Sequence, residues 1–331
     1  MEDRILALSQ TENRNRLCGS VRSLSGDVDT EVIVDRDDIR RQKQEVIKRF
    51  GEWTAHNIQL AEDVYTIGER IAGDEIKLRR VVQTVSDMAG KPFGQLRVLD
   101  LACLEGLYTM EFARHGAEVV AIEGRTANIE KARFAAKVLS LTNVDFFQDD
   151  VRNLSADKYG RFDVVLCLGI LYHLEVPDVF SFLGHVFEVC DGFAVIDTHV
   201  SLGCQKSCVY SGKEYWGREF TEHHASSSLQ ERERSLWASL DNTTSFWFTR
   251  PSLLNLLSHI GFTSVYECHI PGESGKPANR LTLVAIKGQR EQLVCCPLVN
   301  TQPSREIPEK PGHRYAERLL GLWHQVGPLI P

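Results

Sequence analysis

The chain has 331 residues, of which 43% are hydrophobic and 25% charged, and its formal net charge at pH 7 is −7. This composition is ordinary for a folded globular protein and excludes wholesale disorder, collagen-like sequence and a repeat array. No run approaches the roughly 18 apolar residues of a membrane span, and the first residues lack the layout of a secretory signal, so we expect a cytoplasmic protein without membrane contact.

The N-terminal third is predicted to hold a tail and a helical cap. Residues 1–30 are polar and aperiodic, which is typical of a flexible tail. Residues 31–94 are predicted to form an N-terminal helical cap with helices over 35–50 and 74–89, joined by a polar and aromatic connection that is not helical. The first helix places four apolar residues on one face: Ile39, Val46, Ile47 and Phe50.

Residues 95–288 alternate short apolar runs with helical segments, which predicts an α/β domain. Seven strands are expected, over 96–100, 117–123, 143–148, 162–168, 193–197, 263–269 and 280–287. Helices are expected over 106–115, 126–140, 175–190 and 251–260, the last with Pro251 in its first turn and Gly261 after its end. Strands that are apolar throughout indicate a mostly parallel seven-stranded sheet covered on both faces, as in doubly wound, Rossmann-like folds.

Two segments interrupt or follow this alternation. Residues 200–248 form a long polar and aromatic insertion after the fifth strand, which we interpret as a lid. Residues 289–331 are predicted to be an irregular C-terminal extension with one short helical candidate at 314–325.

Acidic residues follow three successive strands of the predicted sheet. Asp100 ends the first, Glu123 the second, and Asp149 and Asp150 the third. In an open parallel sheet the ligand binds at these carboxyl ends, and carboxylates accept hydrogen bonds from ribose hydroxyls, amino groups and an adenine amine. The loop after the first strand keeps only Gly106 and does not spell G-x-G-x-x-G, which argues against a dinucleotide. Acids that merely cap helices are the alternative for any one of these positions.

These motifs together resemble the class I S-adenosylmethionine-dependent methyltransferases over residues 95–288. The matching segments are Val98-Leu99-Asp100-Leu101-Ala102-Cys103 with Gly106, the run ending in Glu123-Gly124, Asp150-Val151, and Phe162 to Gly169 with Leu171-Tyr172-His173-Leu174. The runs around His56 and Ser245–Thr249 are similar to a branch that includes tRNA wobble-uridine carboxymethyltransferases and many small-molecule methyltransferases. Ala102 and Leu104 replace two glycines that are usual in the first motif; Ala102 adds only a methyl group if its backbone conformation is ordinary.

The resemblance implies S-adenosylmethionine as the cofactor and assigns its binding residues. Asp100 and the loop through Ala102 and Cys103 to Gly106 would hold the methionine portion, and Glu123 the ribose hydroxyls. Asp150 and the backbone of Val151 would take the adenine, and Leu168 and Gly169 would flank the sulfonium. The protein would align the acceptor and remove its proton where it has one.

Candidates for the base and the acceptor pocket come from histidines and aromatic residues. His173 and His199 each follow a strand that ends at the site, and a purely structural histidine is the alternative for both. Weaker candidates for substrate contact are His56, Tyr65, Tyr215, Trp216, His223 and Trp247, with His224 and Trp237 nearby in the insertion. Packing of these aromatic side chains against the sheet is the alternative.

The expected function is methyl transfer to a small-molecule acceptor, such as a sugar or secondary-metabolite hydroxyl. One alternative is a tRNA-modifying transferase of the wobble-uridine type, which the negative net charge disfavours. Another is a non-catalytic protein that binds S-adenosylmethionine. No metal site is expected, because Cys204 and Cys208 with His223 and His224 match zinc spacing only loosely. The nine cysteines favour buried thiols over a disulfide framework, and the sequence leaves the oligomeric state open.

Overall fold

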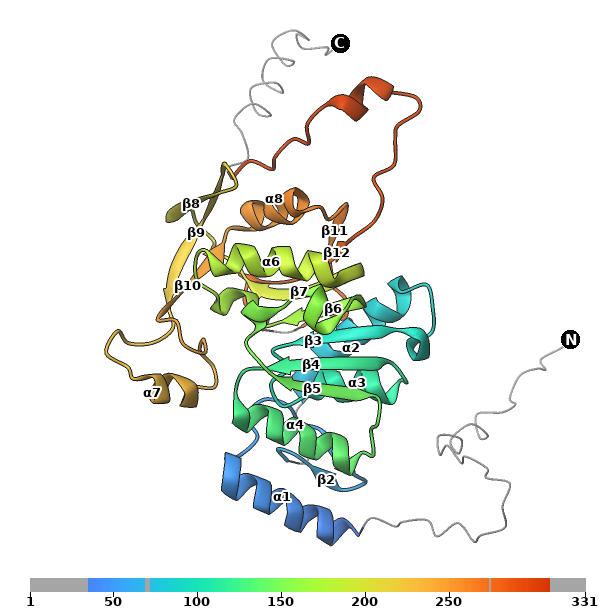
Figure 1. Ribbon diagram of the computed structural model, residues 1–331, viewed down its shortest axis with the longest axis vertical. Helices are drawn as coiled ribbons and strands as arrows, with labels where there is room; N and C mark the ends of the chain where they lie inside the picture. The colour runs from blue at the N-terminus through green and yellow to red at the C-terminus, as the bar shows by residue number, and fades with distance from the viewer. Residues whose placement is uncertain (1–34, 69–71, 274, 310–331) are drawn as a thin grey trace, which may run out of the picture. The chain divides into compact units, whose positions relative to one another are not determined.

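A seven-stranded sheet forms the centre of the fold in the computed structural model, which describes residues 35–68, 72–273 and 275–309 (Figure 1). The strand order is β11-β12-β7-β6-β3-β4-β5. The strands are β3 (Arg97–Leu101), β4 (Glu118–Glu123), β5 (Val144–Gln148), β6 (Phe162–Leu168), β7 (Cys190–His199), β11 (Ser264–Glu267) and β12 (Arg280–Ile286). Neighbours from β5 to β7 pair in parallel, whereas β12 is antiparallel to both β7 and β11. The predicted doubly wound, mostly parallel sheet of seven strands is confirmed.

Helices cover both faces of this sheet, as continuous apolar strands require. In β6, Val164 and Leu166 face α2 (Ala72–Met88) and α3 (Leu107–Arg114), while Val165 and Cys167 face α6 (Asp178–Val189) and α8 (Arg250–Ile260). All four of these strand side chains are fully buried. The chain also contains the helices α4 (Thr126–Val138) and α5 (Ala156–Tyr159) and the short 3-10 turns η1 (Phe93–Gln95), η2 (Val151–Asn153), η3 (Leu171–His173) and η4 (Pro297–Thr301).

The predicted N-terminal extension packs against the edge of the sheet domain. Helix α1 (Arg36–Phe50) lies beside α4, as Figure 1 shows, and buries Ile39 there. The predicted non-helical connection contains a small hairpin of β1 (Gln59–Ala61) and β2 (Val64–Tyr65). The predicted tail over 1–30 and the helical candidate at 314–325 lie outside the described residues.

The insertion after β7 contains a second sheet that the sequence did not predict. Its strands β8 (Lys206–Tyr210), β9 (Lys213–Thr221) and β10 (Thr244–Phe248) are antiparallel in the order β10-β9-β8. Helix α7 (Leu229–Arg234) begins with a capping box in which Ser228 and Glu231 satisfy each other's backbone N–H groups. Residues 235–242, which we call the cover segment, connect α7 toward β10 and reach the carboxyl edge of the large sheet.

Gly217 in the middle of β9 allows the second sheet, β10-β9-β8, to form, because a β-carbon at this position would lie 2.3 Å from the Trp247 carbonyl oxygen. Gly217→Ala is therefore expected to lower the free energy of unfolding by about 1–3 kcal/mol, as overpacking against backbone does. Gly203→Ala is the matched control, since no atom lies within 4 Å of its added β-carbon. Chemical denaturation of the two variants tests this, and equal stabilities would contradict it.

Candidate active site

One cavity of about 570 Å³ lies at the carboxyl ends of β3, β4, β5 and β6. Its wall also includes the N-terminal segment around His56, the cover segment and the first residue of β12. This is the edge where open α/β sheets bind their ligands.

Asp100 contributes a buried carboxyl group to the floor of the cavity. Thr109 Oγ1 donates a 2.6 Å hydrogen bond to Asp100 Oδ2, and the side chain is 2% exposed. Burial raises the pKa of Asp100 to about 7 although the hydrogen bond from Thr109 acts to lower it. The loop after Asp100 is strained, because Ala102 and Leu104 both have φ of 52°, the left-handed region that glycine adopts most easily. The condition under which Ala102 would add only a methyl group, an ordinary backbone conformation, is therefore not met.

The raised pKa of Asp100 predicts a pH-dependent contribution to stability. Protons bind the folded state more tightly than the unfolded one, so this contribution is complete below about pH 4 and is lost as the pH rises through about 7. Asp100→Asn mimics the protonated group, and we expect it to exceed the wild type in free energy of unfolding by on the order of 1–2 kcal/mol at pH 8 and by much less at pH 5. Urea unfolding at both values measures this. Asp145→Asn, at an exposed position of β5, is the control, and a pH-independent difference for Asp100→Asn would contradict the prediction.

Glu105 joins the N-terminal segment to the loop after β3. The backbone N–H groups of Thr54, Ala55 and His56 all donate to its carboxylate at 2.8–3.1 Å. Lys131 Nζ lies 3.2 Å from Glu105 Oε1, and both side chains have no exposed surface. His56 is in this way carried to the cavity wall, where its Nδ1 accepts a hydrogen bond from Leu107 N. Burial, with a smaller effect of Lys77, lowers the pKa of His56 to about 3, so the ring is neutral.

Glu123 ends β4 with its carboxylate held by backbone and side-chain donors. Leu104 N donates to Oε2 at 3.0 Å, and Arg125 N donates to Oε1 at 2.8 Å. Burial raises the pKa of Glu123, while these N–H groups act against the rise. The carboxylate is 4% exposed and lines the cavity, which leaves acceptor capacity on Oε2 for a ligand hydroxyl.

Asp150 and Val151 line the cavity at the end of β5, as expected. The Asp150 carboxylate is already bonded to Arg152, through the backbone N at 2.8 Å and through the guanidinium. The hydrogen bonds that Arg152 donates to Asp150 and Asp241 raise its pKa. Arg152 also pairs with Asp241 of the cover segment at 2.7 Å, so it connects the end of β5 to that segment.

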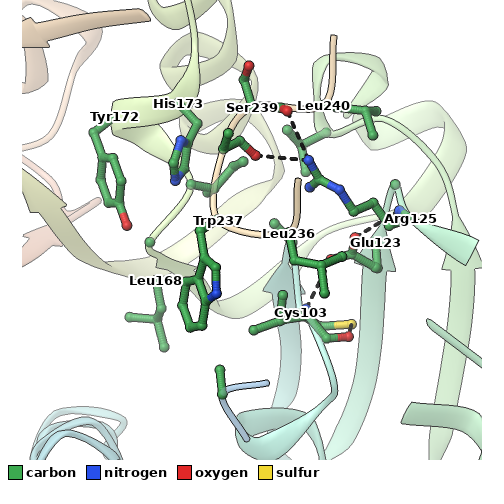
Figure 2. A pocket seen from close by; sticks show the side chains of 18 of the residues that line it. Cys103, Glu123, Arg125, Leu168, Tyr172, His173, Leu236, Trp237, Ser239 and Leu240 are labelled. Carbon is green, nitrogen blue, oxygen red and sulfur yellow. Dashed lines mark hydrogen bonds between the residues drawn. The ribbon is translucent and has the colours of Figure 1, made fainter. Parts of the chain in front are cut away.

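Arg125 fixes the cover segment over the cavity. Its guanidinium donates to four backbone carbonyls, those of Glu233, Ser235, Ala238 and Ser239. Figure 2 shows Leu236 and Trp237 projecting from this segment toward Glu123, Cys103 and Leu168. Trp237 is 68% exposed, which places a large indole surface on the open side of the cavity wall.

A group of charged residues lies where the cavity meets β7 and β12. Asp197 is buried between Lys77, at 3.1 Å, and Arg280, at 2.7 Å. Burial alone would raise the pKa of Asp197, but the two cations outweigh it and lower the value to about 2. The Arg280 guanidinium also lies 5.7 Å from the centroid of the Tyr172 ring. Lys77, Tyr172, Glu273 and Arg280 all line the cavity, so this end presents two cations with a carboxylate beside them.

Leu168, Gly169 and His173 lie on the wall next to these cations. Gly169 has φ of 100°, and its N–H donates to the carbonyl of Asp197 at 2.9 Å, which aligns the ends of β6 and β7. His173 comes from η3, and its Nδ1 lies 2.9 Å from Glu222 Oε2 of the insertion.

Of the two predicted bases, the structure places only His173 at the cavity, and most of the weaker candidates do not line it either. His199 does not line the cavity; its ring stacks on Trp247 at 5.0 Å, and its nitrogens face Asn279 and Arg280. Of the weaker substrate candidates, His56 lines the cavity. The others do not line it: Tyr65, Tyr215, Trp216, His223 and Trp247. Tyr215 shows why the prediction failed: side chains alternate along β9, and this alternation turns Tyr215 into the core. Its hydroxyl lies there 2.8 Å from His259 Nδ1.

Several residues of the site were not found from the sequence. Arg280 could have been found, because it is the first residue of β12. An antiparallel strand such as β12 begins at the sheet edge where the parallel strands end. Glu222 and Arg125 carry no local pattern, since their roles depend on contacts between β9, β4 and the cover segment. Among the described residues, no cluster of three or more His, Cys, Asp or Glu side chains could hold a metal ion.

Comparisons with known proteins show what the chain is similar to. A family model described as a methyltransferase domain matches residues 98–191. Two similar curated proteins are ubiquinone biosynthesis O-methyltransferases. The one from Acinetobacter baylyi is 30% identical over 122 residues, 34% of this chain and 48% of that protein. The one from Rickettsia felis is 30% identical over 149 residues, 44% of this chain and 58% of that protein. The chain thus spans about half the length of the curated relatives it matches.

Among solved structures, the N-terminal domain of EvdMO1 with SAH bound superposes with a TM-score of 0.59 at 24% identity. The alignment covers 77% of this chain and 98% of that one. At this identity the likeness establishes the fold.

Proposed function

We propose that this chain is a class I S-adenosylmethionine-dependent methyltransferase that transfers a methyl group from S-adenosylmethionine to a small-molecule acceptor. The observation that carries the proposal is the convergence of three strand-end carboxyl groups on one cavity, those of Asp100, Glu123 and Asp150. The family model matches the segment that contains all three.

The residues of the cavity fit this cofactor. Glu123 is available to the ribose hydroxyls, and Asp100 with the strained loop to Gly106 to the methionine portion. Val151 lies where it can contact the adenine, and the Asp150 carboxylate would share its acceptor capacity between Arg152 and the adenine amine. Leu168 and Gly169 would flank the sulfonium. When bound, the cofactor supplies an electrophilic methyl group, and the chain's part is to align the acceptor and receive its proton.

A hydroxylated small molecule is the acceptor we propose. The matched curated relatives are named as O-methyltransferases of ubiquinone biosynthesis, and a second EvdMO1 structure was determined with SAH and D-fucose. The exposed indole of Trp237 gives the cavity wall a flat surface on which a sugar face or an aromatic ring could pack. A cytoplasmic site of action fits the buried thiols Cys103, Cys167 and Cys190, which are in no disulfide. None of the described helices combines the length and the apolar character needed to cross a membrane.

Calorimetric titration with S-adenosylhomocysteine tests the cofactor. We expect one site per chain with micromolar affinity, followed by transfer of labelled methyl groups into a small-molecule fraction of a cell extract. No heat of binding from a protein that unfolds cooperatively would contradict the proposal.

A second candidate is favoured by the cationic end of the cavity. Lys77 and Arg280 both pair with Asp197 and also line the cavity beside Glu273, so their remaining donors could hold an anionic group on the acceptor or on the transferred carbon. This suits a tRNA wobble-uridine carboxymethyltransferase, the branch that the sequence resembles. A tRNA gel shift that weakens with added salt would support it, and no binding at low salt would count against it.

A third candidate, a non-catalytic protein that binds S-adenosylmethionine, is favoured by the strained Ala102 and Leu104. Binding of S-adenosylhomocysteine without labelling of any extract fraction would support this candidate over the enzyme.

A further inference from the structure

His173 and Glu222 form a buried pair at the wall of the cavity. His173 reaches the wall from η3, between β6 and α6, and its side chain keeps 16% of its surface exposed. Glu222 directly follows β9 of the insertion, and its side chain is 1% exposed. The two residues are 49 positions apart in the sequence, and Nδ1 of the imidazole lies 2.9 Å from Oε2 of the carboxylate.

The carboxylate of Glu222 is held in its ionised form. Burial acts to raise its pKa, but hydrogen bonds from His173, from Ser245 Oγ at 2.6 Å and from Ser239 N at 2.9 Å outweigh burial and lower it. An ionised carboxylate can only accept hydrogen bonds, so Nδ1 of His173 must carry the proton that it donates. In the neutral ring the lone pair is then on Nε2, which has no hydrogen-bond partner in the part of the chain that the structure describes.

Three other candidates, His56, His199 and Asp100, are less suited to removing a proton from an acceptor. His56 has its Nδ1 bonded to Leu107 N, and burial lowers its pKa to about 3. His199 stands outside the cavity wall, and burial and Arg280 lower its pKa. Asp100 lies on the cofactor side, where Thr109 occupies one carboxyl oxygen.

The geometry points to His173 as the general base and to Glu222 as the residue that positions it, an inference that rests on the proposed function. The acceptor is then a group that carries a proton, such as an alcohol, a phenol or a protonated amine. For a hydroxyl, the oxygen lone pair forms the bond to the methyl carbon, the carbon–sulfur bond breaks with its electrons left on sulfur, and the proton passes to His173 Nε2. Glu222 stabilises the imidazolium that results, as the carboxylate does in catalytic triads.

The cover segment takes part in this arrangement. Ser239 supplies one N–H to Glu222, and Asn242 Nδ2 donates to the carbonyl of His173 at 2.9 Å. The carbonyl of Ser239 in turn accepts from Arg125, which follows Glu123 at the ribose end of the cavity. The base is therefore fixed by a segment that also contacts the cofactor side, as Figure 2 shows for Ser239 and Arg125.

Nitrogen-15 NMR of the histidine rings tests the pair without an acceptor. In the wild type we expect His173 to carry its proton on Nδ1 with Nε2 unprotonated. Glu222→Gln should keep this tautomer, because the amide oxygen can face Nδ1 while the amide nitrogen donates to Ser245 Oγ. Glu222→Ala should lose it. A wild-type ring protonated on Nε2, or one unchanged in Glu222→Ala, would overturn the inference.

Turnover provides the second readout. With labelled S-adenosylmethionine and the extract fraction that the wild type methylates, Glu222→Gln should be at least tenfold slower, because the imidazolium loses its counter-charge. Its affinity for S-adenosylhomocysteine should change by less than about twofold, and the Glu219→Gln control, at an exposed position of β9, should match the wild type. Unchanged turnover in Glu222→Gln would overturn the base assignment alone. A wild type that methylates nothing would overturn the proposed function and the base together.

Discussion

Glu123→Ala is expected to weaken binding of S-adenosylhomocysteine about 100-fold. The buried carboxylate already accepts from Leu104 N and Arg125 N, so it is fixed in place before any ligand arrives. Two charged hydrogen bonds to ribose hydroxyls would each contribute about 1.5 kcal/mol or more, and each 1.4 kcal/mol is a factor of about ten in affinity. Calorimetric titration of the variant against the wild type measures the loss.

Two further variants separate this effect from damage to the fold. Glu118→Ala removes the same side chain from the exposed start of the same strand, where it pairs with Arg97, and should bind like the wild type. Glu123→Gln keeps an acceptor oxygen and should bind with intermediate affinity. If Glu123→Ala binds as tightly as the Glu118 control, the ribose does not lie at the end of β4 and the proposed orientation of the cofactor is wrong.

The main sheet could be predicted from the sequence because its strands are apolar on both faces. Residues such as Val164 to Cys167 are buried in sequence without interruption, and helices of ordinary length separate the strands. Asp100 and Glu123 were found for the same reason, since each lies at the end of such a run, whereas Asp150 comes two residues after β5, a strand with exposed positions. The strand order was not predicted, and no local pattern carries it, because pairing of β3 with β6 joins residues 66 positions apart.

The insertion was harder to predict, and so were the site residues that it supplies, Glu222 and the cover segment. Strands β8 to β10 alternate aromatic and polar residues, which suited a substrate pocket as well as packing. In the structure the alternation sends Tyr215 and Phe248 into the core and leaves Trp247 stacked on Phe220 at 4.5 Å. Glu222 looked like any surface carboxylate, because its partners Ser239, Ser245 and His173 are brought to it only by the fold.

The buried pair of Glu105 and Lys131 carries the largest expected effect on stability. Glu105→Ala would leave the Lys131 ammonium without its counter-charge, and the N–H groups of Thr54, Ala55 and His56 without their acceptor. Breaking a fully buried pair from one side costs about 3–5 kcal/mol in free energy of unfolding. We also expect Glu105→Ala to bind the cofactor more weakly than the wild type does, because Glu105 lies in the loop between Asp100 and Gly106.

A double-mutant cycle distinguishes the charge from the N–H groups. In Glu105→Gln with Lys131→Met, the amide oxygen can still accept from the N-terminal segment and no buried charge is left, so most of the lost stability should return. Each single variant should be clearly less stable than the double variant. Glu111→Gln, on the exposed side of α3, should change the free energy of unfolding little. Additive losses in the double variant, measured by urea unfolding, would mean that the two side chains do not act as a pair. The N-terminal segment would then be held by Glu105 alone, and Lys131 would contribute through Trp53 and the carbonyl of Glu52, which it also contacts.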